Sequence, residues 1–103
     1  MTDPARLSFQ QALPKFSLLS RSYCHLCDDM FIALRELLEG YAQETRLDAL
    51  RDLRIDVVDV DADPQLVAQY DELVPVLLSA EGQVLCHYFL DTPKVREYLS
   101  AFR

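Results

Sequence analysis

Cys24 and Cys27 carry the strongest chemical signal in this sequence, because only two residues separate them. Two cysteines at this spacing can act as a dithiol that cycles with a disulfide, or they can share a metal ion. Redox use requires one thiol that ionises near neutral pH and a second thiol close enough to resolve a mixed disulfide. The pair therefore predicts thiol redox chemistry, with metal binding as the main competing interpretation.

The segments on either side of the pair predict the placement that this chemistry needs. The apolar run 16–20 is typical of a strand and ends shortly before Cys24, and apolar residues recur at helical spacing after Cys27. Cys24 is therefore expected at a helix N-terminus, where free N–H groups and the helix dipole stabilise a thiolate. Such positions lower a cysteine pKa from about 8.5 to roughly 3.5–7.5. With Cys27 one turn further on the same side, Cys24 is the expected nucleophile and Cys27 the resolving thiol.

The rest of the chain alternates between strand and helix patterns. Asp63-Pro64 and Thr92-Pro93 each pair a capping residue with a proline, which is typical of a helix start. The first helix either ends near Gly40 or continues toward Leu47 and Leu50. The expected strands are 16–20, 53–60, 76–78 and 84–89, and the expected helices begin near residues 24, 64 and 93.

This order, β-α-β-α-β-β-α, predicts an α/β fold. A strand, a long crossover and a second strand form a right-handed parallel unit, and the last two strands are spaced as a hairpin. Together they predict a central four-stranded mixed sheet flanked by helices. Residues 1–14 show no clear period, and we expect them to form a flexible lead-in to one domain over residues 15–103.

Composition restricts the class of protein. A chain of 103 residues, half of them apolar, can build one hydrophobic core. Its formal charge of −7 opposes binding to nucleic acid, and no apolar run approaches the ~18 residues of a membrane helix. The first residues lack the apolar stretch of a secretory signal, and an odd number of cysteines, 3, does not suit a disulfide-stapled secreted domain. We therefore expect a cytoplasmic protein. We also expect a monomer, although no pattern in the sequence bears on the oligomeric state.

From Lys15 to the C-terminus, the chain resembles the glutaredoxin-like branch of the thioredoxin fold. The resemblance rests on the motif 23–27 (Tyr-Cys-His-Leu-Cys) after the first strand, on Val74-Pro75 before the third, and on the order of the elements. The most similar group is the short glutaredoxin-like proteins without established substrates. The resemblance implies a thiol–disulfide oxidoreductase with a cis Val74–Pro75 bond, in which the Val74 backbone offers strand-like hydrogen bonds to a substrate.

The same resemblance implies roles for residues near the dithiol. Arg21 matches the basic residue that glutaredoxins carry three positions before the first cysteine, where it would attract a carboxylate of glutathione. Tyr23 is a second expected contributor to the site. The glycine pair that helps glutaredoxins hold glutathione is replaced by residues 90–92 (Leu-Asp-Thr). The expected partner is a thiol or disulfide substrate, protein or glutathione-linked, with glutathione as co-substrate and no tightly bound cofactor.

Zinc binding would use Cys24, Cys27 and Cys86, joined by His87 or His25. However, Cys86 and His87 are adjacent on an expected strand, so their side chains point to opposite faces. We instead interpret Cys86 as a small buried side chain and His87 as a histidine at the core edge.

Binding without catalysis is also compatible with this sequence. The chain could keep this fold and bind a partner through a groove between Tyr23 and Val74, without any redox use of the cysteines. The aspartates at 56, 59, 61 and 63 resemble a calcium site only superficially, because the glycine and distal glutamate of the calcium loop are missing. They are better interpreted as a solvated edge and a helix cap.

Overall fold

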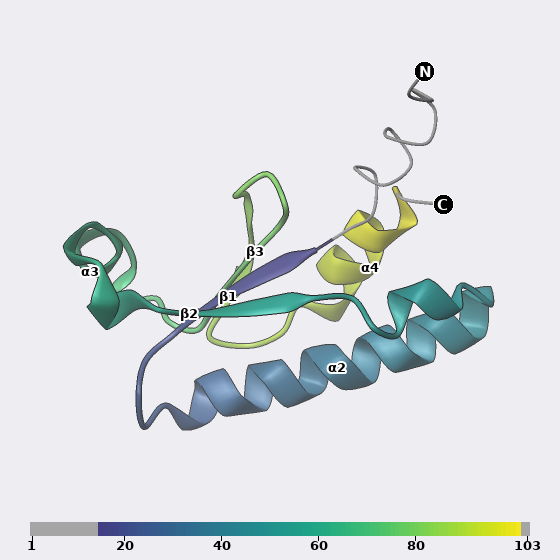
Figure 1. Cartoon of the computed structure of the whole chain (residues 1–103), viewed down its shortest axis with the longest axis horizontal. Coiled ribbons are helices and arrows are strands. Elements are labelled where there is room, and N and C mark those ends of the chain that lie inside the picture. Colours follow the sequence, from purple (N-terminus) through teal and green to yellow (C-terminus); the bar gives the residue numbers. More distant parts are fainter. Residues whose placement is uncertain (1–14, 102–103) are drawn as a thin grey trace, which may run out of the picture.

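The computed structural model describes residues 15–101, and its centre is a four-stranded mixed sheet (Figure 1). The expected lead-in 1–14 and Phe102 lie outside these residues. In chain order the elements are β1 (Phe16–Ser20), α2 (His25–Thr45), the 3-10 turn η1 (Asp48–Leu50), β2 (Ile55–Asp59), the 3-10 turn η2 (Val60–Ala62), α3 (Pro64–Tyr70), β3 (Val76–Leu78), β4 (Val84–His87) and α4 (Thr92–Ser100). The predicted fold class and element order are confirmed.

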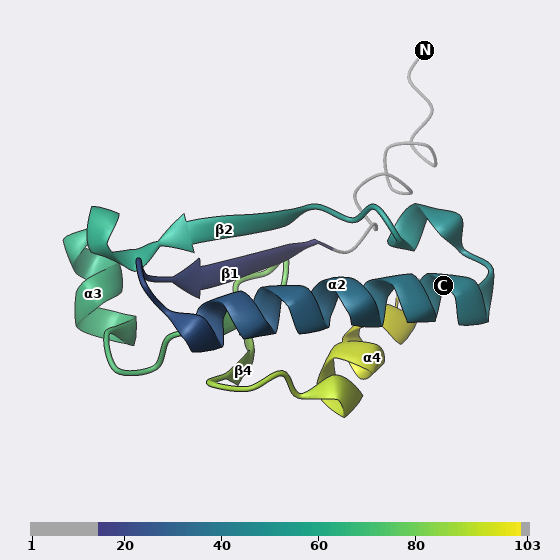
Figure 2. The same cartoon turned by 90° about the horizontal axis from the view of Figure 1, so that it is seen from below.

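The strands follow the order β2-β1-β3-β4 across the sheet. β1 pairs parallel with β2 and antiparallel with β3, and β3 pairs antiparallel with β4. The parallel pair requires a crossover, and α2 supplies it by running the length of the sheet (Figure 2). The carboxyl end of β1, the start of α2 and the start of β3 therefore lie at one end of the molecule.

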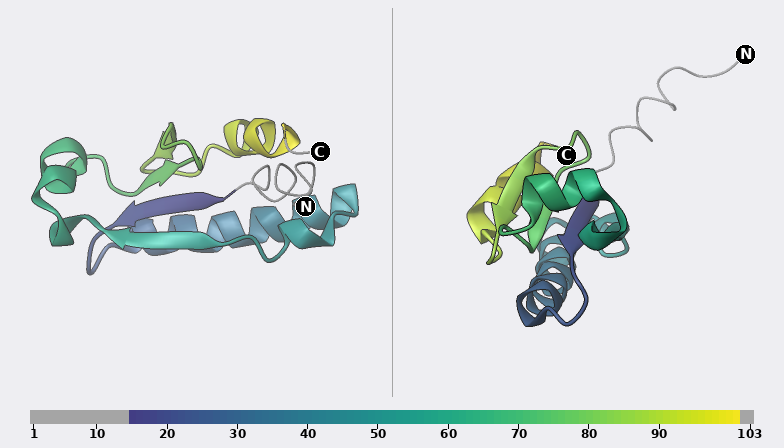
Figure 3. Two further views of the ribbon diagram at one scale, coloured as in Figure 1. Left: turned by 45° about the horizontal axis from the view of Figure 1, so that its top comes forward. Right: turned by 90° about the vertical axis from the view of Figure 1, so that its left-hand side faces the viewer.

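Alternation along the strands divides the core between the two faces of the sheet. Phe16 and Leu18 of β1 point into the larger cluster, which also contains residues of α2 and α4. Leu19 points to the other face, where it packs with Val60 and Val76 and with half-buried residues of α3. Figure 3 shows α2 and α4 apart from α3, which lies at the end of the sheet where α2 begins.

Helix α2 continues past Gly40 to Thr45, which answers the question that the sequence left open. Tyr41 and Ala42 follow Gly40 directly and are both buried in the larger cluster, so their packing favours continued helix. Gly40 itself is exposed, and a Cβ there would meet no atom within 4 Å. Leu50 belongs to the separate turn η1.

Three sequence-based predictions near the C-terminus are wrong. β4 ends at His87 instead of Phe89, because Tyr88 adopts a φ of 67° and leaves the strand. His87 is exposed at the strand end, whereas we expected it at the core edge. The N-cap of α4 is Asp91 and not Thr92, since the Asp91 side chain accepts a hydrogen bond from the Lys94 N–H at 3.1 Å.

Cys86 is buried, as its position on the expected strand indicated. A register shift lies opposite it, between Leu77 and Leu78 of β3. The neighbouring Leu85 is also buried, so the strand places two successive side chains in the core at this irregularity. None of the helices in residues 15–101 combines the length and the hydropathy needed to cross a bilayer.

Candidate redox site

The N-terminus of α2 holds both cysteines of the predicted dithiol. Cys24 is the N-cap residue, with extended backbone angles, and Cys27 lies in the first turn. The two are joined as a disulfide, with their Cα atoms 5.2 Å apart. The Cys24 sulfur also accepts a hydrogen bond from the Cys27 backbone N–H, at 3.0 Å. The helix start thus directs a backbone donor at the sulfur of the expected nucleophile.

The two sulfur-bearing residues differ in their access to solvent. Cys27 is only 3% exposed, whereas Cys24 is half-buried and its neighbour His25 is exposed. A substrate that approaches from solvent therefore meets Cys24 first. The assignment of Cys24 as attacking thiol and Cys27 as resolving thiol stays a prediction.

The Val74–Pro75 segment lies at the same end of the sheet as the dithiol. In the antiparallel pairing of β1 with β3, Leu19 is the partner of Val76. Pro75, one residue earlier, therefore lies beside the end of β1, where the loop to Cys24 begins. The Val74–Pro75 peptide bond is cis, Pro75 is buried and Val74 is half-buried. Val74 is thus partly exposed at the end of the sheet that also holds Cys24 and Cys27.

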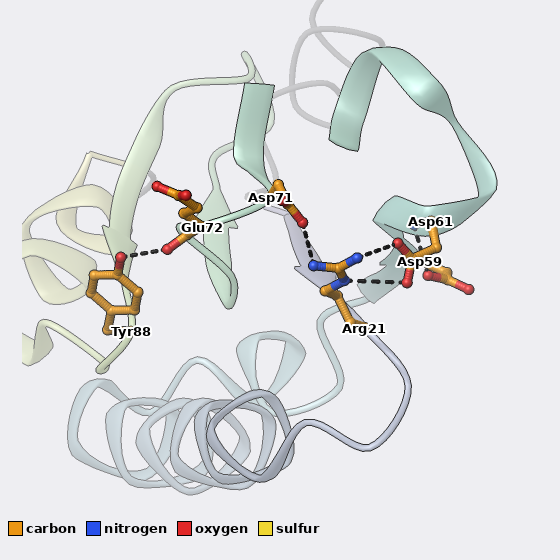
Figure 4. Close-up of polar contacts among 6 residues, drawn as sticks. All are labelled: Arg21, Asp59, Asp61, Asp71, Glu72 and Tyr88. Atoms are coloured by element: carbon orange, nitrogen blue, oxygen red, sulfur yellow. Dashed lines mark hydrogen bonds and ion pairs between the residues drawn. The ribbon is translucent and has the colours of Figure 1, made fainter. Parts of the chain in front are cut away.

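Arg21 is engaged by two carboxylates of its own chain (Figure 4). Its Nε donates to Asp61 Oδ2 at 3.2 Å, its Nη2 donates to Asp61 Oδ1 at 2.7 Å, and its Nη1 bonds Asp71. These hydrogen bonds, with Asp61 contributing most, raise the pKa of Arg21. In return, the guanidinium lowers the pKa of Asp61. Arg21 thus links the loop before Cys24 to η2 and to the end of α3, and its role toward a substrate remains a prediction.

Tyr23 precedes Cys24 and is fully exposed, with a φ of 60°. A positive φ is uncommon for a residue with a side chain, and it is characteristic of tight turns. The turn between β1 and α2 therefore projects an aromatic ring into solvent directly before Cys24. Its use in substrate binding stays a prediction.

Tyr88 is a residue of this site that the sequence did not reveal. Its hydroxyl donates to the Glu72 carbonyl (Figure 4), and its N–H donates to the Pro75 carbonyl at 2.9 Å. The loop that follows β4 is thereby fastened to the segment that carries the cis peptide bond. The aromatic pair Tyr88-Phe89 was hidden in the sequence because it continues the apolar pattern of a strand.

Two clefts flank the first turns of α2. The larger is about 460 Å³ and lies between α2 and the strands β1 and β2; its lining is Leu18, Ser20, Cys27, Asp28, Phe31, Ile32 and Val57. The smaller is about 160 Å³ and lies between α2 and the loop after β4; its lining is Leu26, Asp29, Met30, Ala33, Tyr88, Phe89 and Leu90. Both clefts contain a residue of the Cys24–Cys27 motif.

Cys86 does not share the environment of the dithiol. Burial raises the pKa of its thiol, although a hydrogen bond that the sulfur accepts from the Asp91 backbone acts in the opposite direction. In residues 15–101, no three histidine, cysteine, aspartate or glutamate side chains are grouped as a metal ion would require.

A mixed four-stranded sheet with a dithiol at the start of its long crossover helix, and a proline at the start of the adjacent strand, defines a small protein of thioredoxin-like fold. The chain belongs to the family described as glutaredoxin-like domain (DUF836), whose model matches residues 15–100. The family predicted from residues 23–27 and 74–75 is therefore confirmed.

Several solved structures resemble this chain, and two are described here. Protein Ne2328 from Nitrosomonas europaea, solved by NMR in solution, is 32% identical; the match covers 84% of this chain and 91% of that one, with a TM-score of 0.68. Protein XcR50 from X. campestris, solved by X-ray methods, is 30% identical; the match covers 84% and 96%, with a TM-score of 0.60. No curated protein matches the chain closely enough to count as a relative.

Proposed function

We propose that this chain is a thiol–disulfide oxidoreductase in which Cys24 and Cys27 cycle between a dithiol and a disulfide. The observation that carries the proposal is the Cys27 backbone N–H that points at the Cys24 sulfur, at 3.0 Å. In the reduced protein the same donor would stabilise a Cys24 thiolate, and a hydrogen bond to the charged form of a group lowers its pKa. The buried neighbour Cys27 would then serve as the second thiol.

The reaction proceeds in two exchanges. The Cys24 thiolate attacks one sulfur of a substrate disulfide, which forms a mixed disulfide and releases the first substrate sulfur as a thiolate that takes up a proton. Cys27 loses its proton, and its thiolate attacks the Cys24 sulfur. This closes the Cys24–Cys27 disulfide and releases the second substrate thiol. In sum, with the proton that Cys24 released when it ionised, the protein loses two electrons and two protons, and the substrate disulfide gains them.

We also propose that the chain acts as a cytoplasmic monomer on thiol or disulfide substrates, without a tightly bound cofactor. A reducing compartment suits the chemistry, because the disulfide formed in each cycle must be reduced again before the next. Glutathione and a protein dithiol are the two classes of reductant that can return the electrons.

A redox titration tests this function. The full chain is equilibrated in buffers of glutathione and glutathione disulfide of graded potential, its free thiols are alkylated, and intact mass and peptide mapping locate the label. We expect one two-electron transition confined to Cys24 and Cys27, within the range of about −270 to −120 mV known for related dithiols. The Cys86→Ala variant serves as the matched control and keeps the transition.

Two results would contradict the proposal. One is a Cys24–Cys27 pair that stays reduced in every buffer that oxidises a small-molecule dithiol. The other is a purified, reduced protein that holds one equivalent of zinc, lost when either Cys24 or Cys27 is replaced by serine.

A further inference from the structure

The smaller of the two clefts, which we call the α2 groove, has an apolar lining and lies beside the Cys24–Cys27 motif. Leu26, which lines it, lies between the two cysteines in the sequence. Six of the lining residues are apolar or aromatic, and Asp29 is the charged one. Phe89 is 70% exposed and Leu26 is 39% exposed, so apolar surface remains uncovered at the rim. Exposed apolar surface in a concave site is typical of a binding site.

The wall of the α2 groove is fixed in place. Tyr88, on that wall, holds a φ of 67°, which for a residue other than glycine persists only when neighbours determine it. Its hydrogen bonds to the carbonyls of Glu72 and Pro75 supply that restraint. Because Tyr88 lines the groove and also bonds Pro75, the wall of the groove is attached to the Val74–Pro75 segment.

The charged residues that line the two clefts are both acidic. Asp29 lines the α2 groove and Asp28 lines the cleft on the other side of Cys27, and neither lining contains a lysine or arginine. Arg21 is committed to Asp61 and Asp71. Lys94 lines a different cleft, where Asp91 accompanies it. A cationic ligand is therefore favoured over an anionic one, of which glutathione is an example.

We propose that the α2 groove is a docking site for a polypeptide disulfide, and that it receives an apolar side chain next to the substrate cysteine within a locally cationic stretch. The inference rests on the proposed oxidoreductase function and specifies its substrate class. A volume of about 160 Å³ suits a single aliphatic side chain, and Asp29 at the rim favours a basic residue beside it.

Four short peptide disulfides provide the test. In each symmetric disulfide, the cysteine is followed by leucine or glycine and then by lysine or glutamate. The second-order rate constant for oxidation of the reduced full chain is measured at one pH, and it is divided by the rate constant of the same disulfide with dithiothreitol. We expect leucine to react about tenfold faster than glycine. At low salt, lysine should exceed glutamate by about threefold, and this preference should vanish at high salt.

Single substitutions test which residues of the α2 groove cause the preference for leucine and the preference for lysine. Phe89→Ala should lower the leucine preference and keep the charge preference, whereas Asp29→Asn should do the opposite. Leu47→Ala is the matched apolar control, because Leu47 is as exposed as Leu26 but lies beyond the end of α2. Asp52→Asn removes an exposed carboxylate elsewhere. Both controls should keep both preferences, and circular dichroism confirms that each variant is folded.

The outcomes separate the docking site from the function that it serves. Equal normalised rates for leucine and glycine peptides, or glutathione disulfide reacting as fast as the leucine–lysine peptide, would overturn the docking site and leave the oxidoreductase intact. A reduced pair that none of these disulfides oxidises would overturn the oxidoreductase itself, and the docking site with it.

Discussion

Arg21 and Asp61 form a two-point contact, in which the Nε and Nη2 groups of the guanidinium reach both carboxylate oxygens at 3.2 and 2.7 Å. Arg21 directly follows β1 and Asp61 lies in η2, directly after β2. The contact therefore joins the carboxyl ends of two parallel strands at the end of the sheet that holds the dithiol. The additional bond to Asp71 extends this link to the end of α3.

Replacing Arg21 should destabilise the fold modestly. Arg21→Ala leaves two neighbouring carboxylates without their cation, and we expect its melting temperature to fall by a few degrees. Arg21→Lys should recover only part of this loss, because an ammonium group cannot make the two-point contact. Thermal unfolding followed by circular dichroism measures the effect. Arg54→Ala, which removes a more exposed arginine paired with Asp56, is the matched control and should change the melting temperature less.

The Arg21–Asp61 pair should make the thermal stability of the protein depend on pH. Arg21 lowers the pKa of Asp61, and a carboxyl with a lowered folded-state pKa contributes stability that is fully present above its unfolded pKa. That contribution is lost as the pH falls through the lowered value. The difference in melting temperature between wild type and Asp61→Asn should therefore be largest at neutral pH and shrink below about pH 4. A difference that stays constant on acidification would exclude an ionic contribution.

Cys27→Ser should trap the first exchange. The donor to the Cys24 sulfur is the backbone N–H of residue 27, which serine retains, so Cys24 keeps its stabilising contact while its resolving partner is gone. After incubation with a small disulfide, most chains should carry one mixed disulfide at Cys24, visible by intact mass. Cys24→Ser should carry none at the remaining site residue, Cys27. Comparable adducts on Cys24 and Cys27 in the two variants would contradict the assigned order of attack.

Cys86 should react slowly in the native protein. It is buried, and burial raises its thiol pKa, so little thiolate forms near neutral pH. In the reduced chain, we expect iodoacetamide to label Cys24 at least about tenfold faster than Cys86. Peptide mapping over time measures both rates, and denaturant should remove the difference. Equal native rates would show that Cys24 gains nothing from the helix start.

Most of the fold could be predicted because its signals are local. β-branched and apolar runs mark the strands, and Asp63-Pro64 marks the start of α3, where the Asp63 side chain accepts the Gln65 N–H at 2.9 Å. The position of Cys24 at a helix start followed from a strand pattern before it and a helix pattern after it. The placement of the two cysteines after β1 could therefore be predicted from neighbouring residues alone.

The rest of the site depends on partners that are distant in sequence. Arg21 is 40 residues from Asp61 and 50 from Asp71, and no local pattern links them. The end of β4 is set by Tyr88, whose hydroxyl bonds the carbonyl of Glu72, 16 residues earlier. The wrong prediction of Thr92 as the N-cap of α4 has a different reason. Threonine and aspartate both cap helices well, and the sequence alone cannot rank Thr92 against the adjacent Asp91.

In helix α2, the two sulfur atoms lie apart from the residues that hold the helix to the sheet. The cysteines occupy its cap and first turn, whereas Met30, Leu34, Leu38 and Tyr41 anchor the following turns in the core. On the proposed function, the bond that opens and closes lies within four consecutive residues at the tip of the helix, so we expect these anchors to stay in place. Infrared spectra of the backbone amides should then be nearly the same for the two forms.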